Sequence, residues 1–195
     1  MNLPEVLYAR NIGGSGGSGN KKLAVWDFTV GLTDSVNGYT ATLSGATRDE
    51  DGLHFDSATD SCTIPQFLMS IARTFIIETG AFTAGAFNNG AMFTMLASGS
   101  SYYEGLSYHT ATSKWGLWDH INGWVDSDIA DPDYFANSIV KIVITPERKM
   151  QVYKDDELVF EPSSVLPFVI SDVCLGSKSN NTFYDMDIKK LEVRG

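Results

Sequence analysis

Three of the four tryptophans in the 195-residue chain lie between Tyr102 and Asp128, among tyrosines, histidines and short polar side chains. An aromatic ring can pack on the apolar face of a sugar while Asp, Asn and backbone groups bond to its hydroxyls. The predicted carbohydrate-binding residues are Trp118, Asp119, His120, Asn122 and Trp124. Trp115 and Leu117 fall on the other face of the same predicted strand, because side chains alternate along a strand. The alternative is that these aromatic residues fill the core or cover its rim.

Groups for covalent or acid-base catalysis are not evident. The three histidines, His54, His109 and His120, have no Ser or Cys nucleophile motif nearby, and the chain contains no Gly-x-Ser-x-Gly sequence. Acidic residues cluster at 49–51, 126–133 and 155–157, next to turn residues. Charged residues in turns are usually solvated. We therefore expect no enzyme activity.

Metal ligands are suggested at one place. The segment 126–133 carries four carboxylates, those of Asp126, Asp128, Asp131 and Asp133. Calcium prefers oxygen ligands of this kind, but the spacing does not match the twelve-residue calcium loop, which has Gly at its sixth position and Glu at its twelfth. An acidic loop without a cofactor is expected, and a structural calcium ion is the alternative.

The two cysteines, Cys62 and Cys174, show no spacing typical of a metal site. They predict two buried thiols in strands. A disulfide is the alternative if those strands are neighbours.

The charge of the chain limits its partners. Asp and Glu number 24 against 14 Lys and Arg, which gives a net charge of −10. Such a chain repels phosphate backbones and anionic lipid, so nucleic acid and membrane surfaces are not expected partners. No apolar run approaches the roughly 20 residues of a membrane-spanning helix. Uncharged polymers, cations and other proteins remain.

Short apolar or β-branched runs, separated by turn sequences, recur from Leu23 onward. They predict strands at residues 23–28, 52–56, 74–79, 91–96, 114–118, 138–145 and 150–153. Turn sequences such as Asn37-Gly38 and Asn122-Gly123 lie between them. With almost no helical pattern, the chain is predicted to be an all-β, antiparallel two-sheet domain over residues 23–195.

One strand is predicted to contain a β-bulge. Near the C-terminus, Met186 and Ile188 alternate on one face, whereas Leu191 and Val193 have the opposite parity. An extra residue at 189–190 would return all four side chains to the core.

The N-terminal residues differ from the rest. Residues 13–19 contain only Gly and Ser, so residues 13–22 are predicted to be a flexible linker, either native or introduced by cloning. Residues 1–12 are predicted to be a peptide that docks on a partner or a neighbouring copy. Its docking side chains would be Leu3, Val6, Leu7, Tyr8 and Ile12. A frayed terminus is the alternative. The start of the chain also has no secretory signal pattern, so export by lysis, assembly or a removed signal is expected.

Residues 23–194 resemble concanavalin A-like lectin/glucanase domains of the laminin-G-like type. The segments that carry the resemblance are 26–28, 43–47, 51–56, 60–65, 139–145, 151–156, 174–177 and 180–188. It implies a jelly-roll sandwich with a shallow concave face and loops that hold ligands or calcium in many members. β-Glucanases of this fold carry Glu-x-Asp-x-x-Glu along one strand, which this chain lacks. The family's Asp-Gly hairpin is replaced by Asp156-Glu157, which argues against a tight primed turn.

The N-terminal twelve residues and the Gly/Ser stretch resemble the leaders with which bacteriophage virion proteins attach accessory domains. The combined interpretation is a non-catalytic virion accessory protein, on a capsid or tail, that displays a lectin-like sandwich in many copies and adheres to a host or mucosal glycan. A homo-oligomer or multi-copy assembly is expected. The alternatives are an extracellular or bacterial cell-surface location, a structural decoration protein that binds no sugar, and a glycoside hydrolase.

Overall fold

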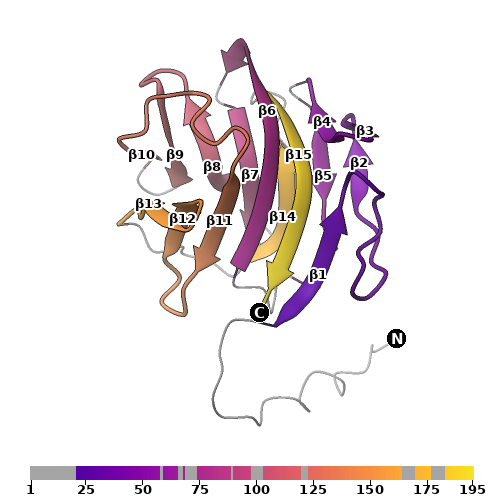
Figure 1. Cartoon of the computed structure of the whole chain (residues 1–195). Coiled ribbons are helices and arrows are strands. Elements are labelled where there is room, and N and C mark those ends of the chain that lie inside the picture. The colour runs from indigo at the N-terminus through magenta and orange to yellow at the C-terminus, as the bar shows by residue number, and fades with distance from the viewer. Residues whose placement is uncertain are drawn as a thin grey trace, which may run out of the picture.

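The computed structural model describes residues 21–57, 59–65, 68, 74–88, 90–97, 103–119, 123–163, 170–176 and 183–195. Two antiparallel β-sheets pack face to face (Figure 1), which confirms the predicted all-β sandwich. The predicted docking peptide and most of the predicted linker lie outside the described residues. The described part of the chain contains no helix that is both long and apolar enough to cross a membrane.

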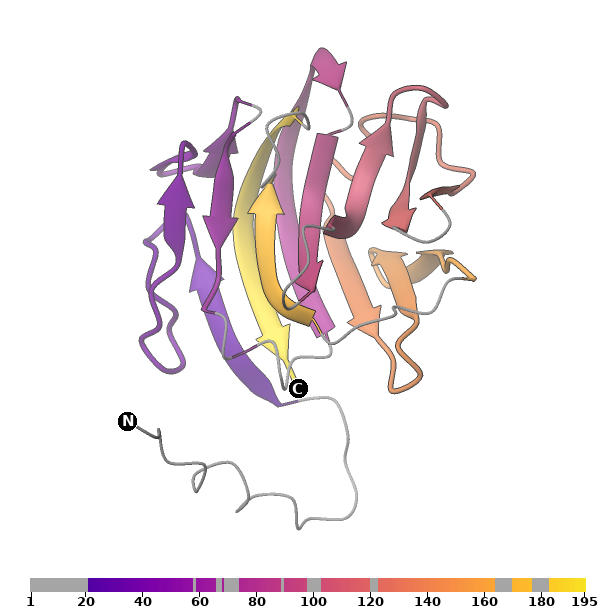
Figure 2. The same cartoon turned by 180° about the vertical axis from the view of Figure 1, so that it is seen from behind.

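The strands are, in chain order, β1 (Lys22–Asp27), β2 (Thr42–Ser44), β3 (Thr47–Asp49), β4 (Gly52–Phe55), β5 (Ser61–Thr63), β6 (Thr74–Asn88), β7 (Gly90–Ala97), β8 (Tyr103–His109), β9 (Lys114–Asp119), β10 (Gly123–Asp126), β11 (Ile139–Ile144), β12 (Met150–Lys154), β13 (Glu157–Phe160), β14 (Ile170–Gly176) and β15 (Phe183–Arg194). The first sheet has the order β13-β12-β11-β6-β15-β4-β3, and β1 also pairs with β15. The second sheet, seen from its own side in Figure 2, has the order β10-β9-β8-β7-β14-β5-β2.

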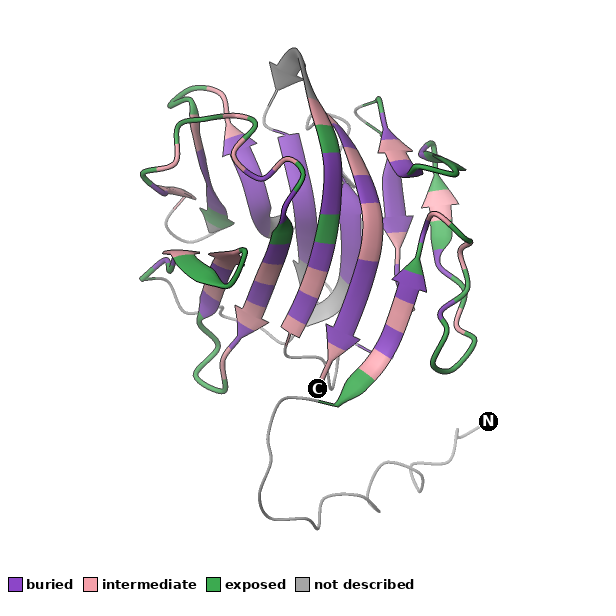
Figure 3. Cartoon of the chain, in the orientation of Figure 1, coloured by how far each residue is buried: buried purple, intermediate pink, exposed green. Residues whose placement is uncertain are grey.

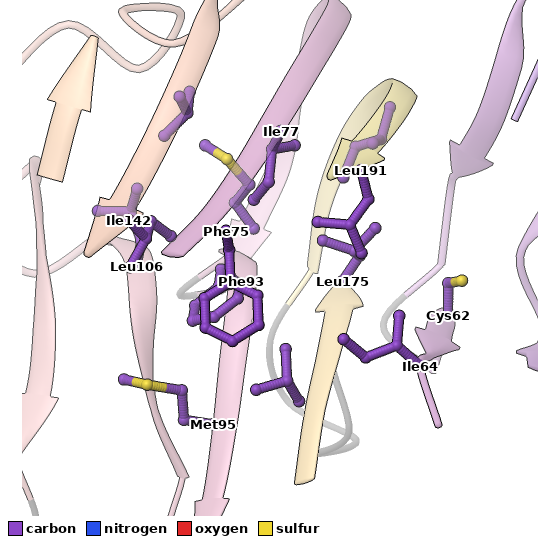
Figure 4. Packing of buried hydrophobic residues seen from close by; sticks show 14 of the residues in the cluster. Cys62, Ile64, Phe75, Ile77, Phe93, Met95, Leu106, Ile142, Leu175 and Leu191 are labelled. Atoms are coloured by element: carbon purple, nitrogen blue, oxygen red, sulfur yellow. The ribbon is translucent and has the colours of Figure 1, made fainter. Parts of the chain in front are cut away.

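The core lies between the two sheets and follows from the period-two pattern of the strands. Along β11, the side chains of Val140, Ile142 and Ile144 are buried, and the residues between them are more exposed (Figure 3). Phe75 of β6 meets Phe93 of β7 across the sandwich, with ring centroids 5.0 Å apart (Figure 4). Aromatic pairs at this distance stabilise a core beyond the area they bury.

The predicted β-bulge lies in β15, an interior strand of the first sheet. Ile188 pairs with Thr79 of β6 while Lys190 pairs with Glu78, so Lys189 is the extra residue. The four apolar side chains of β15 that straddle it are all buried, as predicted: Met186, Ile188, Leu191 and Val193.

The same bulge lets β15 change partners along its other edge. Residues 186–188 pair with β4, and residues 190–194 pair with β1. Between the two, the Lys189 carbonyl accepts a 2.8 Å hydrogen bond from the Phe28 amide. The Lys189 carbonyl therefore keeps a hydrogen-bond partner at the junction, as a backbone group of a buried strand requires.

The hairpin between β12 and β13 corrects one expectation. Lys154 pairs with Glu157, and the two residues between them, Asp155 and Asp156, have φ values of 48° and 69°. Positive φ at both central residues is the pattern of a type I′ turn. Two hydrogen bonds from β11 hold the turn: Asp155 Oδ1 accepts the Ile139 amide at 2.9 Å, and the Lys141 ammonium donates to Asp156 Oδ1 at 2.8 Å. Asp is also one of the residue types that tolerate this backbone region.

The cysteines lie on neighbouring strands without a disulfide. Cys62 of β5 is directly opposite Leu175 of β14, whereas Cys174 is opposite Thr63. Since paired residues share a face, Cys62 and Cys174 point to opposite faces of the sheet. The prediction of two buried thiols is confirmed, and burial raises the pKa of Cys62 to about 12.

Gly52 of β4 provides a test of how closely β4 approaches β15 beside the bulge. Its φ is +128°, and a Cβ there would lie 2.6 Å from the Ile188 carbonyl oxygen. We expect Gly52→Ala to lower the free energy of unfolding by about 1–3 kcal/mol from backbone strain alone. Gly31→Ala is the control, because a Cβ at Gly31 meets nothing within 4 Å. Equal midpoints of urea unfolding for the two variants would contradict this account.

Candidate functional site

The predicted aromatic surface lies at one edge of the second sheet, where β8, β9 and β10 form consecutive hairpins (Figure 2). Alternation along β9 separates its side chains as predicted. Trp115 and Leu117 are fully buried, while Trp118 is 39% exposed on the outer face. The Trp115 indole N–H donates to the Asp131 carbonyl at 3.0 Å, which ties the segment after β10 to the core.

Trp118 and Trp124 lie directly opposite each other on β9 and β10. Their ring centroids are 5.6 Å apart and the rings are inclined by 68°. Trp124 is half-buried. The more exposed ring is therefore that of Trp118, and Trp124 supports it from the neighbouring strand.

A third ring, missed by the sequence analysis as part of this site, completes the cluster. His109, the last residue of β8, stacks on Trp124 with a centroid distance of 4.2 Å and an interplanar angle of 8°. Its Nδ1 lies 3.0 Å from Asp126 Oδ1 and 2.9 Å from Thr112 Oγ1. Two polar contacts and one stacked ring hold the imidazole, so one face of Trp124 is already covered by protein.

Gly116 allows these side chains to meet across β9. It lies between Ser107 of β8 and Asp126 of β10. A Cβ at this position would be 2.7 Å from the Val125 carbonyl oxygen and 3.2 Å from Asp126 Oδ1. The sequence signal for this close approach was the glycine in the Trp-Gly-Leu-Trp pattern of β9. A glycine on the outer face of a strand leaves space for side chains of the neighbouring strands.

The remaining predicted sugar-binding residues are only partly described. The backbone of Asp119 ends β9 opposite Gly123, but its side chain lies outside the described residues, as do His120 and Asn122. The model thus brings Trp118 and Trp124 together. The contribution of the other three stays a prediction.

Three of the four carboxylates of residues 126–133 have separate partners. Asp126 contacts His109, Asp128 lies 3.6 Å from Lys114 Nζ, and Asp131 Oδ1 accepts the amide of Asp133. Within the described ranges, no group of three or more His, Cys, Asp or Glu side chains could hold a metal ion.

Two hollows of the described residues lie elsewhere, one of about 590 Å³ beside Val25 and Leu32 and one of about 270 Å³ around Glu78 and Lys189. Neither is lined by Trp118.

A second polar cluster, also not predicted, lies on the outer face of the first sheet. His54 of β4 bridges two carboxylates: its Nε2 is 2.7 Å from Asp49 Oδ1 and its Nδ1 is 2.6 Å from Asp187 Oδ1. The bond to Asp49 raises the pKa of His54 and outweighs its partial burial, and Asp187 adds to the increase. The same bond lowers the pKa of Asp49. The cluster joins β3, β4 and β15.

Comparison with known proteins identifies the fold. No protein-family model and no curated protein sequence matches the chain. Among solved structures, it is similar to Trypanosoma rangeli sialidase, with a TM-score of 0.68 and 14% identity over 88% of this chain. The chain spans only 30% of that sialidase.

Two other solved structures are also similar. One is domain 4 of AbnA, a GH43 extracellular arabinanase from Geobacillus stearothermophilus, in complex with arabinotriose, with a TM-score of 0.62 and 14% identity over 89% of this chain and 92% of that one. The other is the botulinum neurotoxin serotype D binding domain, with a TM-score of 0.56 and 12% identity over 88% and 47%. At such low identity the likeness establishes the β-sandwich fold alone.

The His54 cluster predicts a pH dependence of stability. Neutral imidazole has one N–H, so only protonated His54 can donate to both carboxylates. Because the folded-state pKa is raised, this stabilisation is complete below about pH 6.5, the ordinary value, and is lost as pH rises through the folded-state pKa. We expect the unfolding temperature to fall across this window and His54→Gln to flatten the decrease. His109→Gln should show the same decrease in unfolding temperature as the wild type. If the unfolding temperature falls equally with pH in the wild type and in His54→Gln, the bridge is refuted.

The separate carboxylate partners in residues 126–133 predict no structural calcium. We expect the same unfolding temperature in EDTA and in millimolar calcium, measured by differential scanning fluorimetry. A calcium-dependent increase that Asp128→Asn and Asp133→Asn remove would instead assign an ion to this loop.

Proposed function

We propose that the chain is a non-catalytic carbohydrate-binding domain whose binding surface is centred on Trp118 and Trp124. The observation that carries the proposal is the exposed Trp118 ring, which lies beside the Trp124 indole. His109 stacks on that second indole and is itself held by Asp126. A fixed aromatic face beside a carboxylate suits a sugar ring, which offers C–H groups to the indole and hydroxyls to the oxygen.

The structural neighbours agree with this class of function. The arabinanase domain, which matches nearly end to end, was determined with arabinotriose, and the neurotoxin match is a binding domain. Sugar binding by a similar sandwich supports, by analogy of fold, the same role for this chain.

Glycoside hydrolysis is the second candidate, favoured by the likeness to the sialidase. The chain spans 30% of that enzyme, and the outer face around Trp118 has Asp126 engaged by His109 rather than paired with a second carboxylate. A glycosidase needs two carboxyl groups about 5–10 Å apart around one bond. The described residues of β8–β10 favour binding.

Display on a virion is a further part of the proposal. It rests on the sequence of residues 1–22 and on the avidity that many copies give to a surface that binds each sugar weakly. Residues 1–12 would attach the domain to other virion proteins, and the sandwich would contact a cell-surface or mucosal glycan. A decoration protein that uses Trp118 in a protein contact is the non-binding alternative.

A glycan array with matched variants tests the binding proposal. We expect Trp118→Ala to weaken retention at least about tenfold, the equivalent of about 1.4 kcal/mol, with little change in unfolding temperature because the ring is exposed. Tyr153→Ala, on the outer face of the first sheet, is the control and should bind like the wild type. A chain lacking residues 1–20 should also bind equally.

Three outcomes distinguish the alternatives. Undiminished glycan binding by folded Trp118→Ala would exclude this surface. If the wild type binds no glycan and Trp118→Ala changes its oligomeric state, the decoration role is supported. Release of reducing sugar from a bound glycan would support hydrolysis.

A further inference from the structure

The charge around the aromatic cluster is one-sided. From residue 74 to residue 140, which includes β6 to β10, the sequence contains one lysine, no arginine and seven acidic residues. The lysine is Lys114, and its ammonium lies 3.6 Å from the exposed carboxylate of Asp128. The strands that form the cluster therefore contain no arginine, and their one lysine is paired with a carboxylate.

Recognition of an anionic sugar needs the opposite arrangement. Carboxylate and sulfate groups are bound through charge-assisted hydrogen bonds, above all by the paired N–H groups of arginine. Near Trp118 and Trp124, such an anion would meet the Asp126 carboxylate and a protein with a net charge of −10. Like charges at an interface oppose association by several kcal/mol when they are desolvated.

The Asp126 carboxylate at this surface can accept hydrogen bonds from a ligand. Asp126 Oδ1 lies against His109, and Oδ2 has no hydrogen-bond partner in the described part of the chain. An ionised carboxylate only accepts hydrogen bonds. Sugar hydroxyls can donate to it, whereas an ionised sugar acid brings acceptors and negative charge to the same place.

We infer that the Trp118–Trp124 surface selects neutral sugars and discriminates against sialylated and sulfated ones. This inference rests on the proposed carbohydrate-binding function and specifies its ligand class. Stacking on Trp118 supplies attraction that does not depend on charge, and Asp126 with the other carboxylates of residues 126–133 supplies the discrimination.

The test uses matched pairs of glycans that share one neutral core and differ only in a terminal sialic acid or a sulfate. The full-length chain is titrated with each member of a pair that the array retains. We expect the neutral member to bind at least about tenfold more tightly. Its affinity should change less than about twofold between 50 and 300 mM NaCl, because stacking is not screened by salt.

Charge variants test the cause. Asp128→Lys, at a fully exposed side chain, should narrow the preference for the neutral member. Asp156→Lys, on an exposed turn of the first sheet, is the matched control and should leave the preference unchanged.

The outcomes separate this inference from the function on which it rests. Tighter binding of the sialylated or sulfated member, lost in Trp118→Ala, would overturn the neutral selectivity and keep the binding function. Retention of no glycan of either kind would overturn both. Equal affinities for the two members, or a preference that Asp128→Lys leaves unchanged, would overturn the electrostatic account.

Discussion

The structure depends on how one long strand satisfies its backbone on both edges. β15 pairs with β6 along its length, and on its other edge with β4 and then with β1. The extra residue Lys189 makes this change possible, because it restores the inward phase of Leu191 and offers its carbonyl to Phe28. A strand without the bulge would expose one half of its apolar residues. The sandwich core, and the second sheet that packs on it, follow from this adjustment.

The candidate site arises from the same alternation at the edge of the other sheet. Trp115 points inward and anchors the segment after β10 through its indole N–H, and Trp118 points outward. Gly116 has no side chain on the outer face of β9, which leaves room there for Asp126. Trp124, Asp126 and His109 can therefore contact one another across β9. One strand therefore serves the core with one face and the surface with the other.

The imidazole side chain has a different role in each of the two histidine clusters. His54 links three strands through two carboxylates, and its raised pKa reflects that bridging position. His109 packs flat on an indole and positions an aromatic surface. In both cases an aspartate fixes the imidazole, in a chain whose acidic residues outnumber its basic ones.

The sequence alone determined the sandwich, the bulge in β15 and the separation of Trp115 from Trp118, because each depends on the local parity of apolar residues. The type I′ turn at Asp155-Asp156 was not predictable, since the bonds that hold it come from Ile139 and Lys141 on β11. The place of His109 beside Trp124, and of His54 between Asp49 and Asp187, was also decided only by tertiary structure. Strand pairing and register join residues far apart in the chain, and a pattern with a period of two carries no information about which strands become neighbours.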